Sequence, residues 1–284
     1  MLEKLRPIFT DPHARGYRIW HDVVMVFIFF SCGALVLESV QSYQDNYAIW
    51  FDWAEWISVA FFTIDAAANI AFAPNPWRYV FSFWGFIDLI SVAPSYLMLF
   101  NLTAVRSTKV IRLLRVARAL RVLKLARAAA DQAEGAERHE TNPLAANLKI
   151  YCIVFFATLM LSSTAMYFVE GHLYDADVIQ AEQQQINAAT PAGQKPATYM
   201  PTDPITGDPI PEDKRFYTSI PAAMWWSITT MTTTGYGDMF PVTVGGRMVA
   251  AVTMLLGLIL FAILLNLINK TMLILLFGEK HGIE

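Results

Sequence analysis

The segment Thr230–Asp238 constrains the fold of this chain more than any other stretch, because of the sequences on either side of it. It reads Thr-Met-Thr-Thr-Thr-Gly-Tyr-Gly-Asp. The apolar segment before it, 220–228, is too short to cross a bilayer, whereas the apolar run after it, 244–277, is easily long enough. Extended backbone at membrane depth is tolerated only where it is buried in protein or lines a watery cavity. The segment is therefore predicted to lie inside a membrane protein, beside such a cavity.

Two glycines in this segment, Gly235 and Gly237, permit φ values that aim successive carbonyl oxygens at one axis. In channels, rings of such carbonyls replace the hydration shell of a potassium ion. The sequence Thr233–Asp238 closely resembles the pore loop of voltage-gated potassium channels, and so do Trp225-Trp226 and Thr230-Met231-Thr232 before it. The alternative interpretation is a glycine-containing turn between two buried helices. The resemblance implies that the selectivity filter consists of Thr233, Thr234, Gly235, Tyr236 and Gly237, with potassium ions held at the first four.

The same resemblance implies how the filter is supported. The indole N–H of Trp225 is expected to reach Asp238 behind the filter, and Trp226 is expected to pack against Tyr236. One position departs from the family: Thr234 stands where valine or isoleucine is usual. That side chain points behind the filter in the family, so we expect selectivity to survive while inactivation or filter rigidity differs.

Two further positions take expected roles from the resemblance. Phe240 falls at the outer mouth, where four phenyl rings would face the entering ion and a quaternary ammonium blocker. Alternatively, its ring packs against the loop before the filter. Gly257 falls where the last helix of the family bends as a gate hinge. The Pro-Val-Pro kink of many animal channels is absent, and Leu264-Leu265-Asn266 stands there instead.

The composition also indicates a membrane protein. Of the 284 residues, 55% are hydrophobic and 16% are charged, whereas about 25% are charged in a soluble domain. Cys32 and Cys152 both lie in apolar segments, so neither a disulfide nor a metal site is implied. The polar and basic segment 1–22 is followed by a long apolar run without a cleavage pattern, so no cleavable signal is expected.

The apolar runs predict an all-α membrane protein with six spans and one half-length segment, since a spanning helix needs roughly 20 apolar residues. Asn142-Pro143 suits an N-cap followed by proline, so the fifth span is expected to begin there. The spans are expected at about 17–40, 49–73, 77–100, 104–130, 143–169 and 244–277. The resemblance then divides the chain into a cytoplasmic N-terminus (1–16), a four-helix voltage sensor (17–130), a linker (131–142), a two-helix pore domain (143–277) and a cytoplasmic tail (278–284). Within the pore domain, it places an extracellular turret at 171–218, a re-entrant pore helix at 220–232 and the filter at 233–238.

Basic residues in short loops predict the orientation, because they favour the cytoplasmic side. Loop 41–48 carries Asp45 and no lysine or arginine. Lys4, Arg6, Arg15 and Arg18 lie before or at the start of the first span, Arg78 lies at the junction of the second and third spans, and Arg138 follows the fourth. Both termini are therefore expected in the cytoplasm of a multi-pass plasma-membrane protein, with the filter opening outward.

The turret segment, 171–218, is long, hydrophilic and rich in Gln, Pro, Thr and Asp. Such a composition predicts a poorly ordered loop without a core of its own. It is expected to be a solvated loop, and a role in binding an extracellular partner is left open.

Basic residues recur at every third position of the fourth apolar segment, with mostly apolar residues between them. They wind slowly around an α-helix but line up along a 3₁₀-helix. The alternative is a basic amphipathic helix on the membrane surface or in a calmodulin complex, which would cluster its charges on one face. The strict repeat after three apolar spans favours gating charges, namely Arg106, Lys109, Arg112, Arg115, Arg118, Arg121, Lys124 and Arg127.

Charges inside a membrane need partners, and acidic residues of the preceding spans are expected to supply them. Phe62 and Asp65 share a helix face because they are three residues apart. By resemblance, Phe62 is the aromatic plug of a charge-transfer site. The expected countercharges are Glu38, Glu55, Asp65 and Asp88. Asn69 replaces the basic residue that the family often has one turn beyond the inner acid.

These features predict a homotetrameric voltage-gated potassium channel, with potassium ions and membrane lipids as its partners. The short tail and lack of further domains favour a prokaryotic member. Cofactors, nucleic acid and enzymatic activity are not expected, because phosphate loops, paired catalytic residues and metal-ligand spacings are absent from the sequence. The alternatives are a weakly selective cation channel or, in another class, a voltage-sensor protein that acts without a conducting pore.

Overall fold

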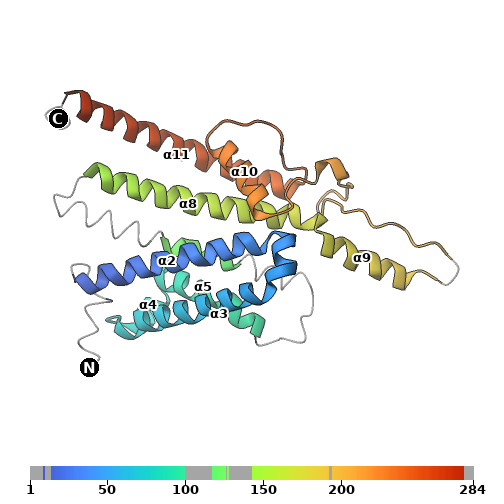
Figure 1. Ribbon diagram of the computed structural model, residues 1–284, viewed down its shortest axis with the longest axis horizontal. Coiled ribbons are helices and arrows are strands. Elements are labelled where there is room, and N and C mark those ends of the chain that lie inside the picture. The colour runs from blue at the N-terminus through green and yellow to red at the C-terminus, as the bar shows by residue number, and fades with distance from the viewer. Residues whose placement is uncertain are drawn as a thin grey trace.

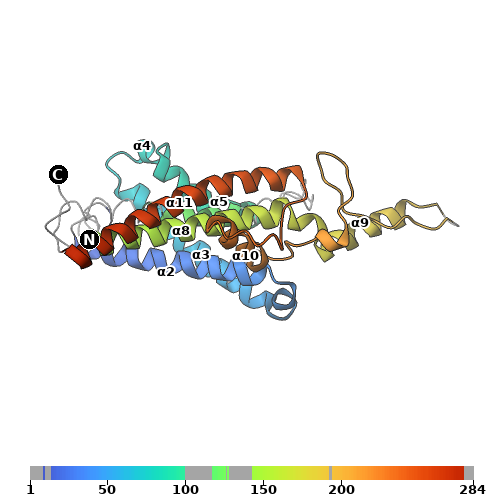
Figure 2. The ribbon, with the colours of Figure 1, turned by 90° about the horizontal axis from the view of Figure 1, so that it is seen from above.

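The computed structural model describes residues 9, 14–99, 117–125, 127, 143–191 and 194–277, and this part of the chain is almost entirely helical. Two groups of helices lie side by side along the long axis of the molecule (Figures 1 and 2). The charged bundle, as we name it, consists of α2, α3, α4, α5 and η3. The filter bundle consists of α8, α10 and α11, together with the turret segment. The start of α2 and the end of α11 lie opposite α9 (Figure 1).

The charged bundle contains α2 (Arg15–Glu38), α3 (Gln41–Phe72), α4 (Pro76–Val80), α5 (Phe83–Leu99) and η3 (Leu120–Leu123). α3 begins at Gln41, ahead of the predicted span at about 49–73. Polar side chains hold this first turn, with Gln41 Nε2 donating to Asp45 at 3.1 Å and Asn46 Nδ2 to the Ser42 carbonyl at 2.7 Å. The non-helical Tyr47 marks a kink between this extension and the rest of α3.

The predicted third span is divided into two helices. α4 ends at Val80, and α5 begins at Phe83 after Ser82, whose hydroxyl accepts the Gly85 N–H at 3.2 Å. A Cβ on Gly85 would lie 2.0 Å from the Tyr79 carbonyl oxygen, so glycine permits this close turn. Serine at a helix start satisfies a backbone donor that has no partner within the helix. The turn between α4 and α5 is therefore built from local capping that hydropathy does not detect.

The filter bundle contains α8 (Pro143–Val169), α10 (Ile220–Met231) and α11 (Val244–Phe277). α8 and α11 have the bounds that the sequence predicts, and α8 begins at Pro143 as expected. α10 has 12 residues and is about 18 Å long, which is too short to cross a bilayer. Ser219 caps its start by accepting the Ala222 N–H at 3.4 Å.

Four described segments are long and apolar enough to cross a membrane. They are Ile19–Glu38, Gln41–Phe72, Leu144–Ala189 (which contains α8) and Val244–Leu276. The apolar stretch Phe83–Leu97 in α5 is shorter. Most of the predicted fourth span, the linker at 131–142 and the tail at 278–284 lie outside the described residues.

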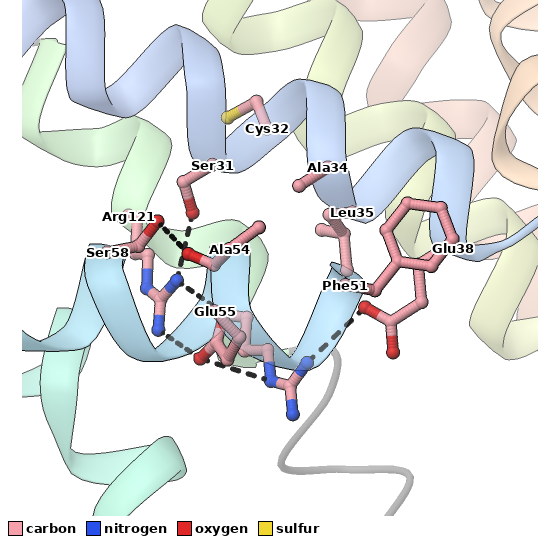
Figure 3. Close-up of a pocket in the computed structure, with 11 residues that line it drawn as sticks. Ser31, Cys32, Ala34, Leu35, Glu38, Phe51, Ala54, Glu55, Ser58 and Arg121 are labelled. Atoms are coloured by element: carbon pink, nitrogen blue, oxygen red, sulfur yellow. Dashed lines mark hydrogen bonds and ion pairs between the residues drawn. The ribbon is translucent and has the colours of Figure 1, made fainter. Parts of the chain in front are cut away.

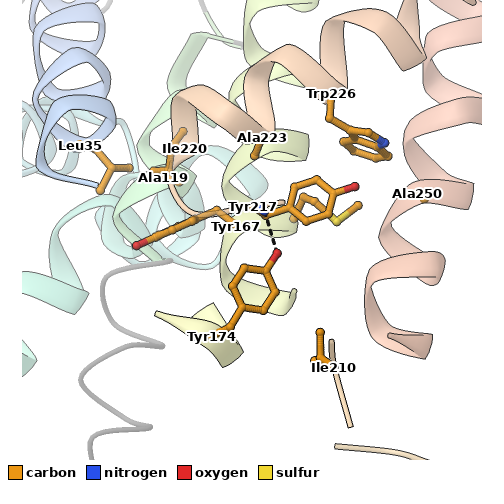
Figure 4. Close-up of a cluster of buried hydrophobic side chains, with 11 residues drawn as sticks. Leu35, Ala119, Tyr167, Tyr174, Ile210, Tyr217, Ile220, Ala223, Trp226 and Ala250 are labelled. Carbon is orange, nitrogen blue, oxygen red and sulfur yellow. Dashed lines mark hydrogen bonds between the residues drawn. The ribbon is translucent and has the colours of Figure 1, made fainter. Parts of the chain in front are cut away.

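The turret segment is folded, contrary to the sequence prediction. It forms η4 (Gly171–Tyr174), α9 (Ala176–Ala189), η5 (Glu212–Lys214) and a tight turn in which Thr202 pairs with Pro209. The Gln183 amide, on α9, donates to the Ala197 carbonyl at 2.9 Å and accepts the Tyr199 N–H at 2.7 Å. The composition is polar, but Tyr174, Ile210 and Tyr217 are buried against the filter bundle (Figure 4). These few large apolar side chains anchor the segment.

The two bundles contact each other within one chain. Leu35 of the charged bundle shares a buried cluster with Ile220 and Ala223 of α10 (Figure 4). The Ser39 hydroxyl, just beyond α2, accepts the Ile220 N–H at 2.9 Å. This hydrogen bond joins the end of α2 to the start of the helix that carries the filter.

Candidate functional site

Arg121 is the most completely buried charged side chain of the charged bundle, with 1% of its surface exposed. All five of its N–H donors have acceptors, which is the full capacity of a guanidinium. Glu55 accepts two of these bonds, at 2.9 and 2.6 Å, in a bidentate ion pair (Figure 3). The other three acceptors are the Ser31 hydroxyl, the Ser95 hydroxyl and the Ser91 carbonyl, each at 2.9 Å. The buried charge is therefore fully compensated, as a charge in a low-dielectric interior must be.

The phenyl ring of Phe62 separates Arg121 from the next basic residue of the repeat, Lys124. The guanidinium carbon of Arg121 lies 5.6 Å from the ring centroid, and Lys124 Nζ lies 5.0 Å from it. Phe62 itself is fully buried. Both cations are within cation–π range of the ring. Phe62 thus forms a non-ionic partition with one cation on each side.

Lys124 lies between two carboxylates on its side of Phe62. Its Nζ is 2.8 Å from Asp65 Oδ2 and 3.1 Å from Asp88 Oδ1. Asp65 also accepts the indole N–H of Trp20, on α2, at 2.9 Å. Two carboxylates therefore hold one buried ammonium, and Asp88 also lies 3.9 Å from Arg127 NH1.

The local helix type explains why the repeat faces these partners. Leu120–Leu123 is a 3₁₀-helix, in which residues three apart are aligned. Arg118 NH1 lies 3.4 Å from Glu38, and its Nε lies 3.5 Å from Glu55. Arg127 NH1 lies 3.9 Å from Asp88 at the opposite end. The other predicted gating charges, Arg106, Lys109, Arg112 and Arg115, lie outside the described residues.

All five residues predicted to face these charges, Glu38, Glu55, Phe62, Asp65 and Asp88, lie beside the basic repeat. Sequence reasoning missed Trp20, Ser31, Ser91, Ser95 and Tyr79, all of which contact these charged groups. Their polar groups are scattered singly through apolar segments. Their only sequence signal is a polar residue at membrane depth.

The filter segment alternates between two backbone conformations. Positive φ occurs at Thr233 (60°), Gly235 (56°) and Gly237 (78°), and not at the residues between them. Such alternation of residues with and without positive φ suits a backbone that aims successive carbonyl groups at one axis. A β-branched residue at positive φ is rare and costs of order 1 kcal/mol. Thr233 therefore carries backbone strain at the place where carbonyls are predicted to coordinate ions.

Two contacts tie the filter to α10. The Trp225 indole N–H donates to Asp238 Oδ2 at 2.8 Å, as predicted. The Thr234 hydroxyl lies 2.9 Å from that of Thr232, so the residue that departs from the family pattern makes a contact that valine cannot make.

Within the single chain, Trp226 does not pack against Tyr236, the partner expected from the family resemblance. Trp225 stacks on Tyr236, with ring centroids 5.7 Å apart, whereas Trp226 meets Tyr217 edge to face at 5.8 Å. Adjacent residues on a helix point about 100° apart. Trp226 therefore faces the buried cluster when Trp225 faces the filter (Figure 4).

A family model described as "ion transport protein" matches residues 17–272. The chain belongs to the ion transport protein family. A candidate potassium channel protein of Rhodopseudomonas palustris is 30% identical over 253 residues, which are 84% of this chain and 50% of that protein. The human voltage-gated potassium channel regulatory subunit KCNG3 is 55% identical over 47 residues, 16% of this chain and 11% of that protein. Human potassium voltage-gated channel subfamily A member 6 is 46% identical over 52 residues, 18% of this chain and 10% of that protein.

The chain spans about half the length of the bacterial relative and about a tenth of the two human ones. Membership of the ion transport protein family, with several apolar helices, makes this a multi-pass membrane protein, and the family is one of transport proteins and not of enzymes. Among the described residues, no group of three or more His, Cys, Asp or Glu side chains is arranged to hold a metal ion.

At the start of α11, two acidic side chains hold the backbone by accepting hydrogen bonds. Glu170 is fully buried and accepts the N–H of Val242, the N–H of Thr243 at 3.1 Å and the Thr243 hydroxyl at 2.6 Å. Asp203, from the turret segment, accepts the Val244 N–H at 2.9 Å. Negative charge at a helix start is favourable. These bonds hold the turret and α8 to the first turn of α11, which the sequence did not indicate.

Two other residues with predicted roles, Phe240 and Gly257, have defined neighbours in the structure. The Phe240 ring lies 5.2 Å from the Phe216 ring and is 45% exposed, so it contacts the turret segment and also leaves a free face. Gly257 lies within the continuous α11, and a Cβ there would come within 2.6 Å of the Met231 backbone. Gly257 therefore permits close packing of α11 on the end of α10.

Proposed function

We propose that this member of the ion transport protein family is a voltage-gated, potassium-selective channel of four identical subunits. The observation that carries the proposal is the position of Arg121 and Lys124, two buried cations of one repeat that both lie near the Phe62 ring and pair with carboxylates on either side of Phe62 along α3, Glu55 and Asp65. Such an arrangement suits a helix that moves its charges one at a time past an apolar partition. The charged bundle is then the voltage sensor, and the filter bundle forms the pore.

The energy available to such a sensor is large enough to open a pore. Moving one charge through the membrane field is worth about 2.3 kcal/mol per 100 mV. Three or four charges in each of four subunits therefore supply tens of kcal/mol. In the state described here, Arg118 and Arg121 lie on the Glu55 side of Phe62, and Lys124 and Arg127 lie on the Asp65 side.

The filter supports both potassium selectivity and a tetramer. The carbonyls of Thr233, Thr234, Gly235 and Tyr236 would bind potassium ions from one side only, so several copies must surround each ion. Residues 232–238 are exposed in the single chain, and so are many apolar side chains of α11. Four chains around one axis would cover these surfaces and close the coordination shell. The exposed hydrophobic surface that remains would contact lipid.

The proposed orientation puts both termini in the cytoplasm and the filter near the outer surface. The charges near Glu38 then lie on the outer side of Phe62, and those near Asp88 lie on the inner side. Inward motion of the repeat would carry Arg121 toward the carboxylates that now hold Lys124. Depolarisation is expected to favour the outward state described here.

The test is a recording of the purified, full-length chain in a planar bilayer under voltage ramps in mixed potassium and sodium. We expect a voltage-dependent current that reverses near the potassium equilibrium potential. A voltage-dependent current with a reversal potential midway between those of the two ions would indicate a weakly selective cation channel. A voltage-independent current would refute voltage gating. Charge movement without any ionic current would indicate a sensor that acts without a conducting pore.

A further inference from the structure

Tyr79 occupies a fixed position at the inner end of the charged bundle. It lies on α4, which packs against both α3 and α5. Its backbone carbonyl is so close to Gly85 that a Cβ there would lie 2.0 Å away. This close turn, which Ser82 caps, fixes the direction in which the phenol leaves α4. No pattern in the sequence assigns this residue a role.

The Tyr79 hydroxyl connects two groups of the charge pathway. It donates to Asp88 Oδ2 at 2.6 Å and accepts a hydrogen bond from Arg127 NH1 at 2.9 Å. The direct distance from Arg127 NH1 to Asp88 Oδ2 is 3.9 Å, which is too long for a hydrogen bond. The hydroxyl therefore bridges Arg127, the last arginine of the repeat, to Asp88. The other oxygen of Asp88, Oδ1, lies 3.1 Å from Lys124 Nζ.

The surroundings suit a cation that is passing through. A small cavity of about 20 Å³ lies beside these groups, lined by His21, Asp65, Asn69, Asp88, Lys124 and Arg127. That volume holds about one water molecule. A neutral hydroxyl accepts a cation's hydrogen bond without the strong attraction of a second carboxylate. It can therefore receive a charge and release it again.

We propose that Tyr79 is an inner station of the voltage sensor, a positioning residue that binds the last basic side chain of the repeat, Arg127, on the inner side of Asp88 and thereby stabilises the outward state. The assignment rests on the proposed voltage-sensing function and extends the site beyond the residues that the family resemblance supplies.

The test is a double-mutant cycle on charge movement in cells that express the full-length channel under voltage clamp. Tyr79→Phe removes only the hydroxyl, and Arg127→Met removes the donors but keeps the length of the side chain. Because a hydrogen bond to a charged group is lost, we expect Tyr79→Phe to weaken the outward state about tenfold. For about three charges per sensor, a tenfold change shifts the charge–voltage curve by about 20 mV toward positive voltages. The total charge moved stays unchanged.

The matched control is Tyr96→Phe, which removes a hydroxyl of the same bundle that contacts Thr63 at 3.0 Å and no basic residue in the described structure. We expect it to leave the curve within a few millivolts of wild type. In the Arg127→Met background, Tyr79→Phe is expected to add no shift. Additive shifts, or equal shifts for the two tyrosines, overturn the proposal.

The Tm values in detergent of wild type, Tyr79→Phe, Arg127→Met and the double variant measure the same contact independently of voltage. If the Tm values show coupling between Tyr79 and Arg127 but the wild-type chain moves no charge, the contact is supported and the proposed function is refuted. If the Tm values show no coupling while wild type moves charge normally, the proposed function is supported and the role of Tyr79 is refuted.

Discussion

The charged bundle and the filter segment differ in how far a single chain encloses their polar groups. Arg121 is 1% exposed, and every one of its donors has an acceptor within the same chain. Tyr236 of the filter is 67% exposed, and the residues around it are exposed as well. One chain therefore satisfies Arg121 completely but leaves the segment around Tyr236 open. Under the proposed function, charge movement would be a property of one subunit and selectivity a property of the assembly.

The largest effect is expected at Gly237. Its φ is 78° and the space beside it is open, so the penalty of alanine is conformational and not steric. We expect Gly237→Ala to abolish potassium selectivity or conduction while charge movement remains. The matched control is Gly207→Ala in the turret segment, where φ is also 78° and the space is also open. A Gly237→Ala channel that keeps both selectivity and conduction would contradict the filter assignment.

The second effect concerns burial along the basic repeat. Arg121→Gln removes one partner of a buried ion pair, which costs about 3–5 kcal/mol, or roughly 40–70 mV when three charges move per sensor. The charge–voltage curve is expected to shift to positive voltages. Arg118→Gln should shift it less, because that side chain is 13% exposed and its ion-pair distances are longer. Both variants should move less total charge. Equal shifts would mean that burial within the bundle does not set the energetics.

Trp225 tests whether the filter depends on support from its own subunit. Trp225→Phe keeps a ring that can stack on Tyr236 but removes the donor to Asp238, and the lost bond to a charged acceptor is worth about 1.5–3 kcal/mol. We expect faster or deeper inactivation during long voltage steps. Asp238→Asn retains an oxygen acceptor and should have a smaller effect. Current kinetics that match wild type in Trp225→Phe would show that the bond does not support the filter.

Phe240 tests the outer mouth, where four subunits would meet. Four rings around one axis would offer cation–π contacts of about 0.5–1 kcal/mol each to a quaternary ammonium ion. Phe240→Val is expected to weaken block by external tetraethylammonium at least tenfold, with internal block unchanged. Phe216→Val is the matched control, because it removes the ring that Phe240 touches and leaves Phe240 in place. Equal external block in wild type and Phe240→Val would mean that this ring packs only against the turret.

The smallest effect is expected at Asp203 in the turret segment. Backbone N–H donors, first that of Ile205 and then those of Val244 and Thr206, hold the pKa of this carboxyl below its usual value, against the opposing effect of burial. A lowered folded-state pKa contributes stability above the unfolded pKa and loses it as pH falls through the folded value. We therefore expect the Tm of wild type to fall below about pH 4 more steeply than that of Asp203→Asn. Parallel pH profiles would contradict this role.

Thr234, which departs from the family pattern, shows what the sequence and the structure each contribute. The sequence identified the residue and the altered filter support, but only the structure supplied its partner, the Thr232 hydroxyl. The role of the Tyr79 hydroxyl depends even more on the tertiary structure. It lies nine residues before Asp88, on a helix that hydropathy merges with the next one, so no local pattern marks it.

The amino-acid sequence by itself determined the features that depend on spacing along one helix or on a short local motif. These include the bounds of α8 and α11, the three-residue repeat of cations and the facing of Phe62 and Asp65, because periodicity specifies which residues share a face. The tertiary structure decided the features that depend on which distant segments meet. The serines that satisfy Arg121, the folding of the turret segment against α10 and the pairing of Trp226 with Tyr217 all belong to this class. The physical reason is that a buried polar group or ring must find its partner across the interior, and spacing along the chain does not encode that distance.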